Sequence, residues 1–313
     1  MIDAPTTGTQ DEPDLPPGAD YLRLPGAPAR AVTWWRWPVG VALILVLDAI
    51  LIDLMFVALD RVIPEDVMYL DPGVRWGGVG MYLVLFAVFI PNFLLVLLVW
   101  SRFHGLPEAR LFSFRFSVRW GHMGRAFAVV FLAFCLFYAV DALLFPEAPG
   151  EVQRQTDWTR WAVLLGITLV LCPIQAASEE MLVRGYGATA LVQMMGGETA
   201  SRTVILVSLV VTSAIFAALH IGNPEAEGQL VPYMLSMLVF SAGMCALVWY
   251  EGGLESAIGY HIANNIFFFA VYGYDDPSTP QSTIWSKRSL ELGATEVIAE
   301  ILITVVLVAL ILA

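Results

Sequence analysis

Two glutamates and an arginine follow an apolar stretch of this chain. Residues 178–185 read Ser-Glu-Glu-Met-Leu-Val-Arg-Gly and come after the apolar run 161–172. On a helix, Glu180 and Arg184 are four residues apart and can form an ion pair, whereas Glu179 is turned by about 100° and has no local cation. A carboxylate without such a partner is suited to act as a general base. The alternative is a solvated helix end with an ordinary ion pair.

Two histidines lie within other apolar stretches. His220 comes near the end of one run, and His261 precedes Asn265 by four residues in another, so this second pair shares a helix face. Hydrolysis of a peptide bond requires a base for water, an acid for the leaving amine and donors for the oxyanion. We predict that Glu179 takes the proton of water and that His220 holds and polarises that water. His261 and the Asn265 amide are the predicted oxyanion donors.

The same side chains could instead bind zinc. Two histidines and one glutamate are a known catalytic ligand set that leaves one position open for water, and here they would be Glu179, His220 and His261. Other protease chemistries fit poorly, because the chain has no His-Glu-x-x-His helix and no Gly-x-Ser-x-Gly elbow, and its single lysine, Lys287, lies in a predicted loop. We expect no cofactor, with zinc as the alternative.

Three motifs at these positions resemble the CPBP family, which includes CAAX prenyl endopeptidases and bacteriocin-processing or self-immunity proteins. They are E-E-x-x-x-R at 179–184, F-x-x-x-H at 216–220 and H-x-x-x-N at 261–265, in the family order, and the resemblance covers about residues 158–270. The candidate catalytic residues in these motifs are Glu179, Glu180, Arg184, His220, His261 and Asn265.

The resemblance implies a glutamate-dependent intramembrane endopeptidase. In such an enzyme the first glutamate and first histidine, here Glu179 and His220, activate water. The second histidine and the asparagine, here His261 and Asn265, would form the oxyanion hole. Family members have been described both as metalloproteases and as metal-free glutamate proteases, so the resemblance leaves the choice between these two mechanisms open.

The elements that must position these residues are membrane-spanning helices. The 313 residues are 58% hydrophobic and 14% charged, whereas a soluble domain has roughly 25% charged residues. Apolar stretches of about 18 to 22 residues can cross a hydrocarbon core of roughly 30 Å. We predict an all-α polytopic membrane protein of about eight transmembrane helices with a catalytic cavity inside the bundle. The predicted spans are 38–60, 79–101, 126–145, 158–177, 203–221, 230–250, 254–273 and 296–313.

These spans leave one difficulty. Glu179 lies near one end of span 158–177 and His220 near the far end of span 203–221, which would separate the two residues by about 20 Å or more. A longer fourth helix, from about residue 158 to 194 and bent near Pro173, would bring Glu179 closer to the middle of the membrane.

The chain divides into a tail and one membrane domain. We predict that residues 1–37 form a disordered cytoplasmic tail that ends in interfacial tryptophans, and that 38–313 form the transmembrane domain, with 158–270 as its catalytic core. The connection 102–125 carries five arginines, which places it in the cytoplasm by the positive-inside rule. With eight spans, both termini then lie in the cytoplasm. We expect the protein in the plasma or inner membrane of the cell.

The expected partners are the lipid bilayer and a membrane-embedded or lipid-anchored peptide or protein substrate; no nucleic acid is expected. A non-enzymatic scaffold or immunity factor of the same fold is one alternative. An ion-coupled transporter that uses Asp48, Asp53, Asp141 and Glu179 is another, although we find no internal repeat. A scaffold has no need for buried ionisable groups that cost at least about 2.5–3.5 kcal/mol each, which favours the enzyme.

Overall fold

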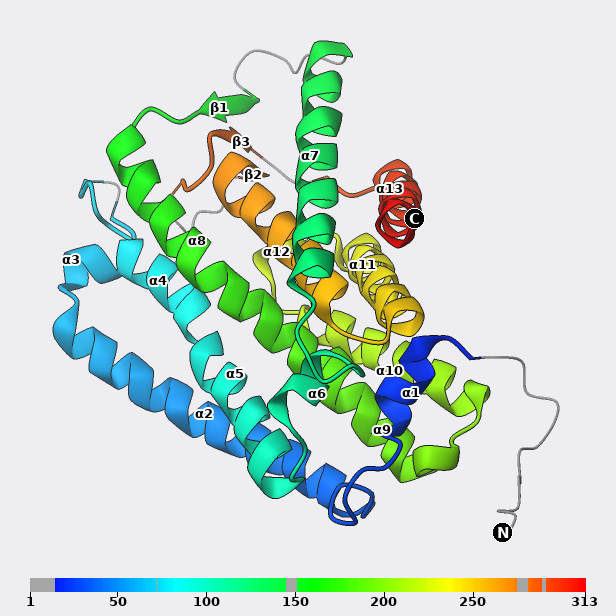
Figure 1. Cartoon of the computed structure of the whole chain (residues 1–313). Helices are drawn as coiled ribbons and strands as arrows, with labels where there is room; N and C mark the ends of the chain where they lie inside the picture. The colour runs from blue at the N-terminus through cyan, green and yellow to red at the C-terminus, as the bar shows by residue number, and fades with distance from the viewer. Residues whose placement is uncertain (1–14, 72, 145–150, 275–280, 289–290) are drawn as a thin grey trace, which may run out of the picture.

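The computed structural model describes residues 15–71, 73–144, 151–274, 281–288 and 291–313. Within them, seven helices are long and apolar enough to cross a membrane, and they form one bundle (Figure 1). The predicted all-α, polytopic fold class is confirmed, and the protein is an integral, multi-pass membrane protein. The candidate spans are α2 (Arg36–Val62), α4–α5–η1 (Val79–Phe103), α7 (Trp120–Leu144), α8–η2–α9 (Trp158–Met195), α10 (Arg202–Leu219), α11 (Leu230–Glu251) and α13 (Ala294–Leu312).

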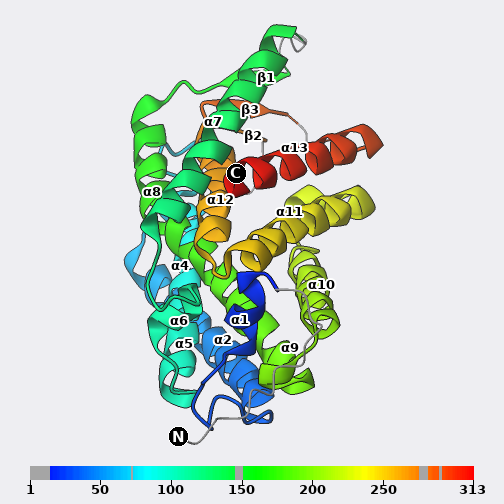
Figure 2. The same cartoon turned by 45° about the vertical axis from the view of Figure 1, so that its right-hand side comes forward.

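Shorter elements connect these helices. A small sheet with strand order β1-β3-β2 lies near the start of α8; β1 pairs antiparallel and β2 parallel to β3. The helices α10, α11 and α13 follow one another on one side of the bundle, with α12 beside α11 (Figure 2). The short elements are α1 (Pro17–Arg23), α3 (Glu65–Met68), α6 (Glu108–Phe112), β1 (Val152–Arg154), η3 (Gly197–Thr199), η4 (Pro224–Ala226), α12 (Glu255–Ile266), η5 (Phe267–Val271), β2 (Tyr272–Tyr274) and β3 (Trp285–Lys287).

The outward faces of the long helices are apolar. On α2, for example, Leu45, Val46 and Leu54 are 54%, 59% and 60% exposed. Lipid tails solvate such side chains as well as a protein core does, so a helix in a bilayer needs no polar outer face. The exposed apolar surface therefore fits a protein that is surrounded by hydrocarbon.

The predicted span 254–273 is not among the seven. Its place is taken by α12 and the π-helical turn η5, which together are shorter than the other spans and lie between α7 and α8 (Figure 1). The segment contains Glu255, His261 and Asn265. Polar side chains in hydrocarbon need partners from protein, so this helix is buried in the bundle instead of facing lipid. The prediction that both termini are cytoplasmic required an even number of crossings and stays a prediction.

The longer fourth helix is confirmed. Residues Trp158–Met195 form one continuous span of 38 residues, in which Pro173 lies inside α8. A π-helical stretch, η2 (Met181–Gly187), begins directly after Glu180 and leads into α9 (Ala188–Met195). At 1.5 Å per residue this span exceeds a hydrocarbon core of roughly 30 Å. Glu179 therefore lies within the helix and not at its end.

The structure describes the second part of the predicted disordered tail, from residue 15 onward. Residues 1–14 lie outside the described residues, but α1 is a helix that packs on the bundle, which corrects the prediction for this part. The Tyr21 hydroxyl donates to the Leu111 carbonyl, and the Gln193 amide donates to the carbonyls of Leu22 and Arg23. Tyr21 and Leu22 are fully buried. Tail composition alone could not reveal partners that come from distant helices.

The three tryptophans before α2 do not share one environment. Trp34 and Trp35 are 62% and 47% exposed, as expected for an aromatic belt, but Trp37 is fully buried. Its ring stacks on His104 at 4.0 Å between centroids. The His104 ring in turn forms a 2.7 Å hydrogen bond with the Tyr186 hydroxyl. This contact joins the start of α2 to η1 and η2.

Gly40 provides the space for that contact. A Cβ atom at Gly40 would lie 1.8 Å from the Tyr186 hydroxyl oxygen and 3.1 Å from His104 Nε2. We expect Gly40→Ala to displace Tyr186 and to destabilise the protein by about 1–3 kcal/mol, as overpacking typically does. Tyr186→Phe removes the clashing oxygen, so Gly40→Ala should cost less in that background. Thermal unfolding in detergent measures both effects, and strictly additive losses would contradict the packing described here.

Two acids hold the start of α7 against the junction of α11 and α12. Glu255 is fully buried and accepts hydrogen bonds from Arg119, the closer one at 2.7 Å from Nη2. Glu251 binds His122 Nδ1 at 3.0 Å and the Ser256 hydroxyl at 2.6 Å. These pairs fix the N-terminal end of α12, which carries His261 and Asn265.

Candidate active site

The centre of the candidate site is a buried ion pair. Glu180 and Arg184 are both fully buried, and Arg184 Nη1 lies 3.1 Å from Glu180 Oε1, as predicted from their spacing. The same Glu180 oxygen lies 2.8 Å from His261 Nδ1. A carboxylate can only accept, so Nδ1 carries the hydrogen of this bond. The second ring nitrogen, Nε2, is thereby directed away from Glu180.

Phe216 connects the second motif to the other two. The guanidinium of Arg184 lies 4.1 Å above the centre of the Phe216 ring. The His220 ring is 4.4 Å and the His261 ring 6.2 Å from Phe216, measured between centroids. Arg184 also donates to the hydroxyl of Ser241 on α11. Segments far apart in the sequence therefore meet around one aromatic ring.

Glu179 has one occupied and one free oxygen. Its Oε1 accepts a 2.7 Å hydrogen bond from Gln175 Nε2. Its Oε2 is buried and has no hydrogen-bond partner among the described residues, and it lies 3.6 Å from His261 Nε2. The Glu179 side chain is 15% exposed, so the carboxylate is nearly enclosed. Oε2 is thus the oxygen whose lone pairs are left for a water molecule.

Asn265 contacts other amides. Its Nδ2 donates to Gln175 Oε1 at 2.8 Å, and its Oδ1 accepts from Asn264 Nδ2 at 2.9 Å. One hydrogen of Nδ2 is left for another acceptor. Sequence reasoning did not include Gln175, although a polar residue four positions before Glu179 in an apolar helix was a signal that could have identified it.

His220 is close to the site but does not touch Glu179 in the described structure. It follows α10 as its C-terminal cap, is half-buried, and its Nδ1 lies 2.8 Å from the Phe216 carbonyl. That bond places the hydrogen on Nδ1 and leaves the lone pair of Nε2 free. Of the described histidine–acid ion pairs, none joins His220 to Glu179.

The residues proposed as zinc ligands do not form a three-ligand site in this arrangement. Among the described residues, no three histidine, cysteine, aspartate or glutamate side chains are grouped closely enough to hold one ion. Glu179 and His261 are close to each other, but His220 is not close enough to complete the set.

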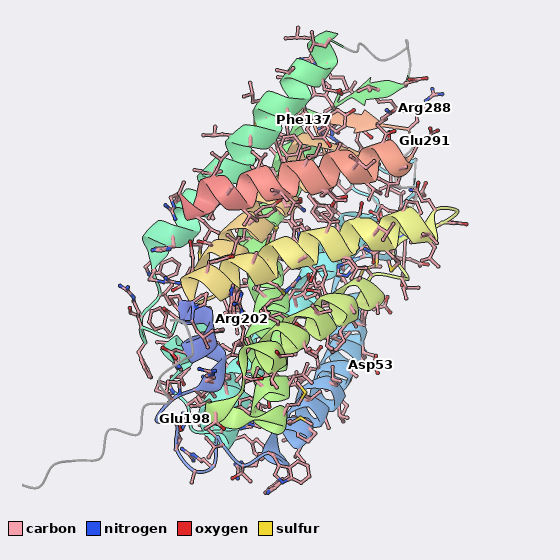
Figure 3. The ribbon with its side chains drawn as sticks, turned by 90° about the vertical axis from the view of Figure 1, so that its right-hand side faces the viewer. Asp53, Phe137, Glu198, Arg202, Arg288 and Glu291 are labelled. Carbon is pink, nitrogen blue, oxygen red and sulfur yellow. The ribbon has the colours of Figure 1, made fainter. Side chains whose placement is uncertain are left out.

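The acids outside the motifs lie apart from each other. Asp48 on α2 accepts a long 3.4 Å hydrogen bond from Asn92, and Asn92 accepts a 2.7 Å hydrogen bond from the hydroxyl of Ser178, next to Glu179. Asp53 is exposed on α2 (Figure 3), and Asp141 is half-buried on α7. Among the described residues, Asp48 is the one of these three acids that hydrogen bonds connect to the helix of the candidate site, through Asn92. These contacts do not provide the relay of all four acids that the transporter hypothesis requires.

The buried pair predicts a large loss of stability when it is broken. Arg184→Met leaves the Glu180 carboxylate buried without its cation, and breaking such a pair costs about 3–5 kcal/mol. The double variant Glu180→Gln/Arg184→Met has no uncompensated charge, and the new amide can still accept from His261. Denaturant titration in mixed micelles should therefore find the double variant more stable than Arg184→Met alone. Equal or greater instability of the double variant would contradict the pairing.

Together, the fold and the site define a polytopic helical membrane protein with a glutamate, a histidine and amides inside its bundle. Residues 159–267 match the family described as type II CAAX prenyl endopeptidase Rce1-like. The match includes all six candidate residues and confirms the resemblance that the three motifs indicated.

The chain is also similar to a curated bacterial protein. The uncharacterized protein YyaK of Bacillus subtilis (strain 168) is 27% identical over 151 residues, which are 48% of this chain and 48% of that protein. The chain thus matches about half the length of this relative. No solved structure matches the chain.

Proposed function

We propose that this protein is an intramembrane endopeptidase of the Rce1-like type and that Glu179 is its general base. The observation that carries the proposal is the state of the Glu179 carboxylate, with Oε1 held by Gln175 and Oε2 free beside His261 Nε2. This carboxylate lies in the segment that is similar to the endopeptidase family. A nearly enclosed, partly free carboxylate is suited to activate a water molecule.

In the proposed hydrolytic step, the unpaired atoms Glu179 Oε2 and His220 Nε2 hold the attacking water. Oε2 of Glu179 takes a proton from a water molecule, and the lone pair of His220 Nε2 accepts the other hydrogen and orients that water. The water oxygen bonds to the scissile carbonyl carbon and forms a tetrahedral intermediate. The carbon–nitrogen bond then breaks, and Glu179 passes its proton to the leaving amine. No redox partner is needed, and the carboxylate is regenerated.

The oxyanion would be bound by Asn265 and His261. Asn265 has one N–H left after its bond to Gln175. Since His261 donates its Nδ1 hydrogen to Glu180, a second hydrogen bond from Nε2 requires the imidazolium form. The Glu180 carboxylate compensates that charge, as the aspartate does in a serine-protease triad. Glu180 and Arg184 are then positioning residues, and His261 and Asn265 bind the reacting oxygen.

The location of the site supports a proposal for the substrate class. Helices that face lipid surround it, so a substrate reaches it from the bilayer or its surface. We propose a membrane-embedded or lipid-anchored peptide, of the prenylated or leader type. We further propose that the protein resides in the plasma or inner membrane, with the basic connection 102–125 in the cytoplasm.

Peptide cleavage tests the proposal. We expect the purified protein in detergent to cleave members of a panel of prenylated CAAX-type and leader-type fluorogenic peptides. Glu179→Gln and His220→Ala should each lower kcat by about 10²–10⁴-fold, because each removes a group that activates water. Glu198→Gln is the matched control, since this exposed acid lies in η3, after α9, and accepts a hydrogen bond from the Gly26 backbone and not from a candidate residue (Figure 3).

The outcomes separate the alternatives. Wild-type activity in Glu179→Gln would contradict the assignment of the base. Activity that survives a strong chelator supports the mechanism without metal, whereas loss of activity that zinc restores would support the metalloprotease alternative. A wild-type protein that cleaves no peptide of the panel would favour the scaffold reading.

A further inference from the structure

We infer that Gln175 is a positioning residue that selects which oxygen of Glu179 acts as the base and aligns Asn265 with it. This inference rests on the proposed function, because it assigns a role to a residue that contacts the proposed base. Gln175 belongs to none of the three motifs. It is 8% exposed on α8, and both ends of its amide are hydrogen-bonded to residues of the candidate site.

The amides form a chain across the interface between α8 and α12. Asn264 donates to Asn265, Asn265 donates to Gln175, and Gln175 donates to Glu179, over distances of 2.9, 2.8 and 2.7 Å. The two helices pack directly on each other (Figure 1). The chain therefore ties the proposed base on one helix to the proposed oxyanion donor on the other.

The direction of this chain is determined by Glu179. An ionised carboxylate can only accept hydrogen bonds, so the NH₂ group of Gln175 must face it. The oxygen of Gln175 then accepts from the NH₂ group of Asn265, and the oxygen of Asn265 accepts from the NH₂ group of Asn264. The network therefore fixes which end of each amide carries the oxygen and which carries the nitrogen. The remaining N–H of Asn265 is consequently fixed on the side that faces away from Gln175.

This arrangement has two consequences for the reaction. The bond from Gln175 occupies Glu179 Oε1, so Oε2, which lies 3.6 Å from His261 Nε2, is the oxygen left to take the proton of water. Loss of Gln175 frees the carboxylate to rotate and frees the Asn265 amide to turn over. An error of about 1 Å in such a group can lower the rate by about 10²-fold.

Gln193 provides a matched control on the same continuous span. It is also a buried glutamine, 4% exposed, but its amide bonds to carbonyls of α1 and not to the site. Gln193→Leu therefore removes a buried amide of the same kind without touching Glu179. Any general effect of losing a buried glutamine should appear in both variants.

Steady-state kinetics on a cleaved peptide provide the first test. We expect Gln175→Leu to lower kcat about 10²-fold and to leave KM nearly unchanged, and Gln193→Leu to retain kcat. In Gln175→Glu, a protonated carboxyl can donate to Glu179 and accept from Asn265 as the glutamine does, whereas an ionised one cannot donate. The activity of Gln175→Glu relative to wild type should therefore fall as the pH rises. Wild-type kcat in Gln175→Leu, or equal losses in both leucine variants with no pH-dependent recovery, would overturn the inference.

A stability cycle tests the same contact without any substrate. If Gln175 bonds Asn265, Gln175→Leu and Asn265→Leu together should lower the Tm by less than the sum of the two single shifts. Gln193→Leu with Asn265→Leu should be additive. Additivity in the Gln175 pair would overturn the inference by itself. Coupling in a protein that cleaves no peptide would show that the amide chain exists and that the proposed function is what fails.

Discussion

The buried carboxylate of Glu180 is the constraint on which the site depends. An anion at this depth must be paired, and one of its oxygens accepts from both Arg184 and His261. Such a pair adds little net stability compared with apolar packing, but it is costly to break. Its effect is to hold one particular arrangement, in which the first and third motifs are in contact.

Several features of the structure follow from that arrangement. Arg184 lies in the π-helical stretch η2 and places its guanidinium on the Phe216 ring. Phe216 in turn contacts the rings of His220 and His261. π-Helical turns inside α-helices are frequent at functional sites because they shift side chains relative to the regular repeat. Here the irregular turn begins immediately after the two glutamates.

The bilayer explains why buried polar side chains gather into sets whose members hydrogen-bond to one another. In hydrocarbon no water is available to satisfy a free amide or carboxylate, so each such group must find a protein partner. The amide chain from Asn264 to Glu179 is one such set, and the contacts of Glu255 with Arg119 are another. The helix α12 contributes to both, which is why it lies inside the bundle. The free oxygen of Glu179 belongs to neither set, as expected of a group that reacts.

The sequence by itself determined the fold class, the motifs and the pairing of Glu180 with Arg184, because hydropathy and helical spacing are local properties. It also indicated the long fourth helix. Only the tertiary structure decided that α12 is buried inside the bundle and that α1 packs on the bundle. It also decided that Gln175 bridges Glu179 and Asn265, and that His220 contacts Phe216 and not Glu179. These features depend on partners from helices distant in the chain, and such contacts have no period or spacing that a single sequence records.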